Sequence, residues 1–314
     1  MPHDSVRDLI SRVAQGRLAR DVYHLAKAPL PFRKLNYTVP GHSKCTLYEA
    51  DDLIEAELRR AGWAVEKEAV QVQAFRHDAS RPRAHQYSSP QPEDPWYTAY
   101  NVWGRRRGSR QPDEVIILCA HKDSQSWVDS PGAYDNAVGT AADLEIARVL
   151  ADYEPHRSVW FLFCNEEHTP WTSVAAAEQC KRRGDNVVAV LNQDGLGGKS
   201  REDAEAGGKP LVTAYTLEDG RRLAELMGEV NAAYGIGLTH SVVKRGFAND
   251  DDGSFVKAGY GAAIVNIGSF PYADPNYHIE SDTPENVDME NLHMSVQAVL
   301  AALLRLDRDG PPAP

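Results

Sequence analysis

The stretch of residues 115–150, VIILCAHKDSQSWVDSPGAYDNAVGTAADLEIARVL, constrains the fold more than any other part of the chain. Its apolar start, residues 115–120, predicts a strand buried on both faces, which runs into His121 and Asp123. A polar loop follows, and Asp135 and Asn136 stand directly before apolar residues at helical spacing. Strand, polar loop and helix form a unit that often carries chemistry, because ligands bind beyond the carboxyl ends of parallel strands.

Strands and helices alternate along the rest of the chain. After the first unit we expect strands at residues 157–164, 187–191, 211–215 and 262–267, and helices at 173–183, 218–234, 254–258 and 289–306. Before it we expect helices within 4–29 and at 46–60, a half-exposed strand at 63–75, and a hairpin that pairs 100–104 with 115–120. This alternation predicts an α/β fold, a three-layer α/β/α sandwich with a central mixed, mostly parallel sheet.

The chain shows no internal repeat and no low-complexity linker before its DGPPAP tail. We therefore expect residues 1–314 to form a single catalytic domain on which the N-terminal helices of residues 4–60 pack. Residues 76–96 are rich in proline, arginine and serine, and they are interpreted as a surface excursion.

Composition excludes several classes of protein. The net charge of -11 and the pI near 5.5 argue against nucleic acid as a partner. The apolar runs have the length of strands, far below the ~18 residues of a membrane helix, so no membrane partner is expected. No export signal is visible at the start and the four cysteines show no paired spacing, so we expect a cytoplasmic protein with free thiols.

Polar residues follow the other predicted strands as well. VWFLFC is followed by Asn165, Glu166 and Glu167, where buried carboxylates require a compensating cation or donor. The next strand ends at Asp194, and the loop after the last strand presents Tyr277, His278 and Asp282. Each signal is weak alone, but together they bring two histidines and several carboxylates to one edge of a sheet.

This inventory has the chemistry of a metal site. Imidazole and carboxylate without thiolate suit Zn²⁺, with Mn²⁺ or Co²⁺ as substitutes in vitro. Asp135 has two oxygens and could bridge two metals, the arrangement used in metal-assisted hydrolysis. Asp123 and Asp282 lie near His121 and His278 in sequence, so we expect each carboxylate to accept the second imidazole N–H of its histidine.

Five motifs in order, AHKDS, GAYDNAVG, CNEEHTPWTS, LNQDG and YHIESDTPENVD, resemble the M28 family of zinc aminopeptidases, which includes leucyl and aminopeptidase Y-like enzymes. The resemblance covers about two-thirds of the chain. It implies the zinc exopeptidase fold, also called phosphorylase/hydrolase-like, and two Zn²⁺ ions per chain. It further implies a cis peptide bond after the bridging aspartate. The implied ligands are His121, Asp135 and Asp194 for one ion, and Asp135, Glu167 and His278 for the other.

The resemblance also implies a reaction. Glu166 would be the general base for a water shared by the two metals, and the enzyme would remove N-terminal residues from peptide or aminoacyl substrates. Tyr277 is either a substrate-binding group that stabilises the oxyanion or a packing residue. Three alternatives stay open: an M20-like carboxypeptidase or deacylase, a single-zinc glutaminyl cyclase-type enzyme, and a non-enzymatic binding module on the same fold.

Some residues depart from the family pattern. Lys122 stands between His121 and Asp123, and we expect it to point away from the metals, because its charge would repel them. Asp250 to Asp252 stand where relatives often have Ser-Asp-His. They would attract a substrate amine or a basic side chain, or else form the N-terminal cap of the helix that begins at Ser254. Trp127 and Tyr134, in the first polar loop, are candidates for the wall of the substrate pocket.

Overall fold

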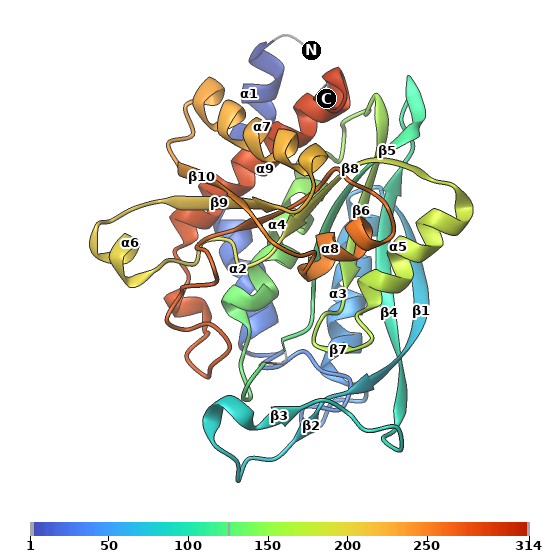
Figure 1. The fold of residues 1–314 in the computed structure, drawn as a ribbon, viewed down its shortest axis with the longest axis vertical. Helices are drawn as coiled ribbons and strands as arrows, with labels where there is room; N and C mark the ends of the chain where they lie inside the picture. The colour runs from blue at the N-terminus through green and yellow to red at the C-terminus, as the bar shows by residue number, and fades with distance from the viewer. Residues whose placement is uncertain (1–2, 125, 313–314) are drawn as a thin grey trace.

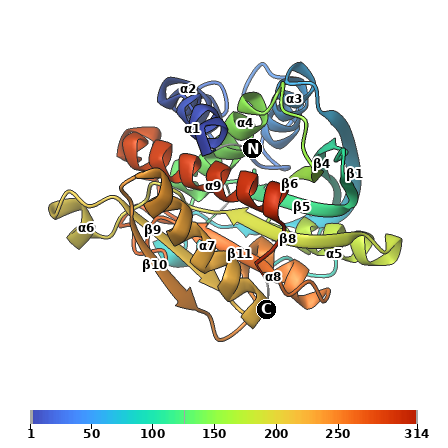
Figure 2. The same cartoon turned by 90° about the horizontal axis from the view of Figure 1, so that it is seen from above.

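The structure, a computed structural model, describes residues 3–124 and 126–312. Within these residues, nine strands form one mixed sheet that lies between layers of helices (Figures 1 and 2), which confirms the predicted α/β/α class. In sheet order the strands are β10 (Thr239–Lys244), β9 (Pro210–Tyr215), β11 (Ala263–Ile267), β8 (Asn186–Gln193), β5 (Gln111–His121), β6 (Arg157–Cys164), β4 (Trp96–Arg106), β1 (Ala64–Ala74) and β7 (His168–Thr169).

The centre of the sheet positions the candidate site. β11 pairs with β8, β8 with β5 and β5 with β6, always in parallel. The four strands therefore present their carboxyl ends at one edge of the sheet. Their residues are almost all buried, as expected for parallel strands covered on both faces.

Two helical layers cover the sheet. The larger layer contains α1 (His3–Ser11), α2 (Gln15–Ala26), α3 (Thr46–Arg60), α4 (Val138–Val149), α7 (Glu218–Tyr234) and α9 (Met289–Asp309). The smaller layer contains α5 (Thr172–Arg183) and α8 (Asp250–Lys257), which contact each other and pack on Trp103, Ile117 and Leu162. α9 is the longest helix, and its apolar side chains are buried against α1, α2, α4 and α7 because they recur at helical spacing.

The predicted hairpin between residues 100–104 and 115–120 is wrong. β4 pairs with β1 and β6, whereas β5 lies between β6 and β8. The chain passes from β5 through α4 and returns as β6 parallel to β5, so that β6 separates β5 from β4. A short turn signal between two strands does not reveal that a third strand, later in the chain, lies between them.

Two further elements were not predicted, and one predicted helix begins at a different residue. β10 and the short helix α6 (Arg201–Glu205) were not predicted, because β10 is an edge strand with largely exposed, polar residues. α8 begins at Asp250 and not at Ser254, and Asn249 is its N-terminal flanking residue. The helix at Thr46–Arg60 is as predicted, and Gly62 beyond it has a positive φ of 78°.

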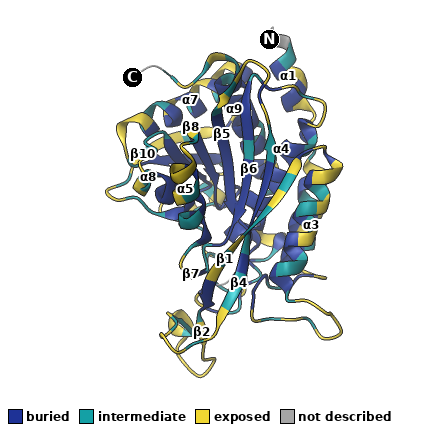
Figure 3. Cartoon of the chain, turned by 90° about the vertical axis from the view of Figure 1, so that its right-hand side faces the viewer, coloured by how far each residue is buried: buried dark blue, intermediate teal, exposed yellow. Residues whose placement is uncertain are grey.

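The surface excursion folds back on itself. β2 (Arg76–His77) and β3 (Tyr87–Ser88) pair as a small hairpin with a 3₁₀ turn at Arg83–His85 between them. The hairpin projects beyond the sheet at the bottom of Figure 1, and Figure 3 shows that most of its residues are exposed. Two further short segments are Ala133–Ala137, a kinked turn in which Asp135 and Asn136 have non-helical backbone angles, and the 3₁₀ helix Pro284–Asn286.

Two predictions from composition can be compared with the structure. The four cysteines are unpaired, and three of them are buried. Among the described residues, no helix is both long enough and apolar enough to cross a membrane.

Candidate metal centre

The carboxyl ends of the four central strands bring the predicted site residues together. His121 is the last residue of β5, Glu166 and Glu167 follow β6, and Asp194 follows β8. His278 belongs to the long loop after β11. The site thus combines residues that are up to about half the chain apart, as the pattern of strand ends predicted.

The first group of candidate metal-ligating atoms belongs to His121, Asp135 and Asp194. Nε2 of His121 lies 2.9 Å from Oδ1 of Asp135 and 3.4 Å from Oδ1 of Asp194. The three side chains are buried, and their candidate ligand atoms all lie within 4.8 Å of one another. Such a cluster is of the size that encloses one metal ion.

The second group belongs to Asp135, Glu167 and His278. Nε2 of His278 lies 2.7 Å from Oδ2 of Asp135 and 3.9 Å from Oε1 of Glu167. Asp135 therefore faces the first group with one oxygen and the second group with the other. The peptide bond between Asp135 and Asn136 is cis, as the resemblance implied.

The residues fit divalent cations by their charge. Burial, reinforced by Asp135 and Asp123, raises the pKa of Glu167 well above its usual range. Oδ1 of Asp194 is buried without a hydrogen-bond partner. Carboxylates placed this closely need a compensating positive charge, and the imidazole and carboxylate donors suit zinc.

Asp123 holds the ligands of both groups in place. Its Oδ1 accepts hydrogen bonds from Nδ1 of His121 (3.1 Å) and from the backbone N–H of Glu166 (3.1 Å). Its Oδ2 accepts from the N–H of Glu167 (3.0 Å) and from Nδ1 of His168 (2.7 Å). Although burial opposes ionisation, these donors lower the pKa of Asp123, so it stays a carboxylate.

The predicted partner of Asp282 is wrong. Its oxygens accept the backbone N–H groups of Tyr134 (2.6 Å) and Asp135 (3.1 Å), while Nδ1 of His278 has no hydrogen-bond partner. His278 adopts a positive φ of 62° in a tight turn, and the carboxylate four residues later is directed at the loop of Asp135. Asp282 therefore supports the shared residue through its backbone. Burial raises the pKa of Asp282 to about 8.

Glu166 lies beside the first group. Its Oε2 is 3.8 Å from Nε2 of His121 and has no hydrogen-bond partner. Burial, followed by the charges of Asp251 and Asp250, raises the pKa of Glu166 well above its usual range. A carboxylate that is buried, close to the ligands and without a partner has the environment of a general base.

Asp250 joins Glu166 and Asp194 at one end of the site. The candidate ligand atoms of these three carboxylates lie within 4.8 Å of one another. Arg245 binds Asp250 (2.6 Å) and also pairs with Asp252. Of the two interpretations of the acidic run, capping is wrong, because the three aspartates lie inside the first turn of α8. We call Glu166, Asp194 and Asp250 the acidic end of the site.

Lys122 points away from the metal ligands, as predicted. Its side chain is fully buried, and Nζ donates to the carbonyl of Tyr100 (2.7 Å) and to Oδ1 of Asn165 (2.8 Å). It also forms an ion pair with Asp51 of α3 at 3.1 Å.

Three residues of the surroundings had no signal in the sequence. His168 binds Asp123, the hydroxyl of Tyr272 donates to Oδ2 of Asp194 (2.7 Å), and the buried Arg33 donates to backbone carbonyls, including that of Gly132 (2.7 Å). A lone loop histidine, tyrosine or arginine carries no pattern, because only the fold brings it to the site.

Aromatic rings form one wall of the site. The ring of Tyr277 stacks on His278 with centroids 3.7 Å apart, and Trp127 meets His278 edge-on at 5.1 Å. Trp127 is 44% exposed, whereas Tyr134 is buried. Trp127 lines a hollow beside Glu167 and His278, and Tyr134 does not.

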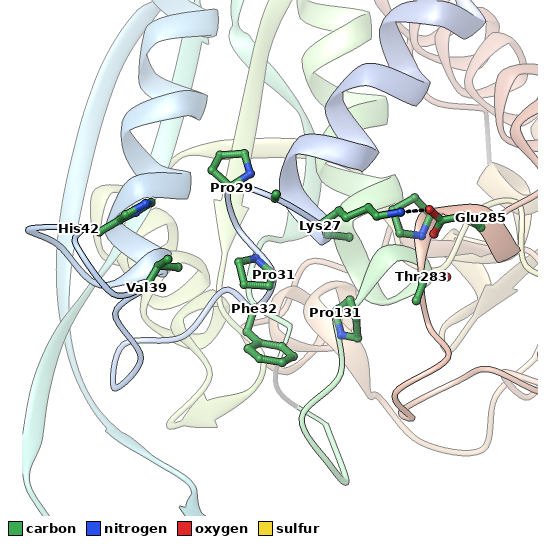
Figure 4. Close-up of a pocket in the computed structure, with 12 residues that line it drawn as sticks. Lys27, Pro29, Pro31, Phe32, Val39, His42, Pro131, Thr283 and Glu285 are labelled. Atoms are coloured by element: carbon green, nitrogen blue, oxygen red, sulfur yellow. Dashed lines mark hydrogen bonds and ion pairs between the residues drawn. The ribbon is translucent and has the colours of Figure 1, made fainter.

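A larger hollow of about 540 Å³ lies elsewhere (Figure 4). It is lined mainly by apolar side chains such as Pro29, Pro31 and Phe32, and Lys27 and Glu285 form an ion pair at one side of it. None of the predicted site residues that the structure describes lines it, so size alone does not identify the place of chemistry.

The fold is that of solved structures of the zinc exopeptidase type, and the two groups of histidine and carboxylate atoms at its strand ends could each hold a metal ion. Residues 101–303 match the sequence model of Peptidase family M28, and the chain belongs to this family.

Relatives and solved structures agree with this membership. Leucine aminopeptidase 1 of Phaeosphaeria nodorum is 27% identical over 206 residues, which are 62% of this chain and 52% of the relative. A probable zinc metalloprotease of Pyrenophora teres f. teres is 28% identical over 57% of this chain and 42% of the relative. An aminopeptidase from Aneurinibacillus sp. strain AM-1 shares the fold, with a TM-score of 0.72, 14% identity, and coverage of 96% of this chain and 95% of that chain. The chain spans about half the length of the curated relatives it matches.

Proposed function

We propose that this M28 metallopeptidase is an aminopeptidase with two zinc ions per chain. The observation that carries the proposal is the acidic end, Glu166, Asp194 and Asp250, which shares Asp194 with the first ligand group. A free α-ammonium group is the part of a peptide that such an end attracts, because opposite charges interact strongly where water is excluded.

The two groups of candidate ligand atoms indicate which residues would hold each zinc ion. His121, Asp135 and Asp194 would hold one ion, and Asp135, Glu167 and His278 the other, with Asp135 shared. When bound, zinc supplies Lewis-acid polarisation of a carbonyl and lowers the pKa of water. Lys122 and Arg33 are turned away into hydrogen bonds with the protein. Arg245 pairs with Asp250 and Asp252, but the carboxylates at the site still outnumber this one cation.

Glu166 is assigned the proton transfers. Its unpartnered Oε2 takes a proton from the attacking water and later passes it to the leaving amine. Asp123 fixes this residue by accepting its backbone N–H, and the same carboxylate fixes the ring of His121. The base and a ligand are therefore positioned by one buried group.

Tyr277 is proposed to stabilise the oxyanion. Its ring is held parallel to His278 and to Tyr272, with centroids 5.0 Å apart for the tyrosine pair. Burial raises the pKa of the Tyr277 hydroxyl, so it stays protonated and can donate a hydrogen bond.

An M20-like carboxypeptidase requires a cation for the substrate carboxylate. Among the described residues near the site, the cations Arg33, Lys122, Arg245 and Lys34 are each already engaged by protein carbonyls or carboxylates. A single-zinc cyclase requires one ligand set, whereas the presence of two groups of three candidate ligand atoms supports two ions here. The M20-like carboxypeptidase and the single-zinc cyclase are therefore alternatives that the following test distinguishes from the aminopeptidase.

The test combines metal analysis with Glu166→Gln. The purified protein should bind two equivalents of zinc and cleave unblocked aminoacyl amides, and Glu166→Gln should lose about 10²- to 10⁴-fold in kcat while it retains both metals. Glu178→Gln, an exposed glutamate of α5, is the matched control and should be unaffected.

If the protein binds one equivalent of zinc per chain and cyclises N-terminal glutamine, it is a glutaminyl cyclase-type enzyme and the proposal is wrong. Turnover restricted to N-acylated substrates would favour M20-like chemistry, and undiminished cleavage by Glu166→Gln would remove Glu166 from the mechanism.

A further inference from the structure

A hollow of about 290 Å³ opens beside the second ligand group, and we call it the hairpin pocket. Its floor contains Glu167 and His278, and its walls include the side chains of Phe75, Tyr87, Ser89 and Trp127. Tyr87 and Ser89 belong to the excursion of residues 76–96, which projects at the bottom of Figure 1. Phe75 directly precedes the excursion, and Trp127 comes from the loop before Asp135.

The excursion is anchored to the rim of the site at several points. The N–H of Tyr87 donates to the carbonyl of Trp127 at 3.3 Å, and its hydroxyl donates to Asp129 at 2.5 Å. Arg83 forms an ion pair with Glu280, two residues beyond His278. The wall of the pocket is therefore attached to the same loops that carry the ligands.

The sheet fixes the remaining wall. Ala74, the last residue of β1, pairs with His168 of β7, and His168 directly follows Glu167. Phe75 comes next after Ala74, so the register of β1 against β7 sets its place beside Glu167. A ring held by strand pairing is a rigid contact surface for a ligand.

The two ends of the site differ in chemistry. The acidic end adjoins the first ligand group, whereas the hairpin pocket adjoins the second. If the α-ammonium of a substrate lies at the acidic end, the scissile carbonyl lies near the shared Asp135. The chain beyond the scissile bond then runs toward Glu167 and His278, into the hairpin pocket.

We propose that the hairpin pocket binds the residue that follows the scissile bond and selects it by size. This inference rests on the proposed aminopeptidase function and adds a substrate class to it, dipeptides and short peptides with an apolar second residue. About 290 Å³ is at the lower limit of small-molecule pockets, which suits one side chain. The rings of Phe75, Tyr87 and Trp127 supply apolar contact, and Ser89 supplies a hydroxyl for the peptide backbone.

The test compares substrates that share one N-terminal residue, X. X is the residue whose aminoacyl amide the enzyme cleaves most efficiently. The amide has no second residue, whereas X-Ala, X-Phe and X-Trp fill the pocket to increasing degrees. Ser89→Trp fills the pocket from an exposed position, and Phe75→Ala enlarges it. Ala79→Phe, exposed on the same hairpin and outside the pocket, is the matched control.

Ser89→Trp should raise KM for X-Phe at least about tenfold, with an effect on the X-amide that is much smaller. Phe75→Ala should shift the ratio of kcat/KM for X-Trp over X-Ala upward by at least about tenfold. The loss should appear in KM and not in kcat, because the pocket contacts the same group in the ground state and the transition state.

Equal losses on the amide and the dipeptides would overturn the proposal, and so would unchanged ratios in both variants. A changed preference for X with the amide as leaving group would assign the pocket to the N-terminal side chain instead. If the parent protein cleaves no unblocked amide or dipeptide, the proposed function fails first and this inference with it.

Discussion

The buried ion pair between Lys122 and Asp51 allows a quantitative prediction. Both side chains are almost fully inaccessible to solvent, and Nζ of Lys122 lies 3.1 Å from Oδ1 of Asp51. Burial, the largest influence, raises the pKa of Asp51, although Lys122 and Lys67 oppose the rise. The perturbation is Lys122→Met, which keeps the approximate length of the side chain and removes the charge.

The magnitude follows from what Lys122→Met leaves behind. The carbonyl of Tyr100 retains a hydrogen bond from Asn165 at 3.3 Å, so the main loss is the charge partner of Asp51. The remaining cation, Lys67, is 3.8 Å away and partly exposed, which makes it a weak substitute. Breaking a buried pair by removing one partner costs about 3–5 kcal/mol, and we expect a loss of this size at pH 8.

The loss should depend on pH with a defined sign. Without Lys122 the folded-state pKa of Asp51 moves further above its unfolded value. At a pH below the pKa of Asp51 in the unfolded state, Asp51 is protonated in both states, so its burial without a charge partner costs the variant least unfolding free energy. The variant loses stability as the pH rises through the folded pKa. The difference in unfolding free energy between parent and variant should therefore be smaller at pH 5 than at pH 8.

Urea unfolding of the metal-free parent and variant measures this difference at both pH values, since metal binding would add its own dependence on pH. Lys67→Met, the matched control, should cost under about 1 kcal/mol, because that pair is partly exposed. The double variant Asp51→Leu with Lys122→Met should lose less than Lys122→Met alone, because no buried charge remains. A pH-independent loss below about 1 kcal/mol, or an additive double variant, would refute the reasoning.

Three further predictions follow from the site. Asp123→Asn removes one oxygen from a carboxylate with four donors, so zinc affinity measured by chelator competition should fall about 10- to 100-fold; an unchanged affinity would show that Asp123 does not orient the ligands. Removal of zinc should lower the melting temperature, because about 4 kcal/mol of binding energy at 1,000 times Kd is lost; calorimetry with and without chelator measures it, and equal melting temperatures would contradict a built metal site. Gly198→Ala would place Cβ 2.0 Å from the ring of Tyr134 and should lower the free energy of unfolding by at least about 1–3 kcal/mol. Gly16→Ala, with nothing within 4 Å of the new Cβ, is the control and should be neutral or slightly stabilising in urea unfolding. Equal effects of the two substitutions would mean that the loop of Gly198 adapts.

Sequence reasoning found the ligand candidates because each strand ends directly at its polar residues. His121 and Asp194 stand where an apolar run stops, and the pair Glu166 and Glu167 does too. Parallel strands present such ends at one edge, so periodicity and order along the chain were enough to gather these residues.

Interactions between distant residues were not accessible in the same way. The position of β6 between β4 and β5, the direction of Asp282 toward the loop of Asp135, and the approach of Asp250 to Glu166 depend on packing between elements far apart in the chain. One carboxylate near a histidine in sequence has several possible partners, and only the tertiary structure selects among them.

The sequence by itself determined the order of the central strands and of most helices, the class of the fold and the inventory of candidate ligands, because these are set by local periodicity and by residues at strand ends. The tertiary structure alone decided which carboxylate supports which group, where Lys122 is neutralised, and that the excursion with Tyr87 forms a wall beside His278. The physical reason is that hydrogen bonds are directional and short-ranged and that ion pairs weaken with distance, so both form only once the sheet has brought those segments together.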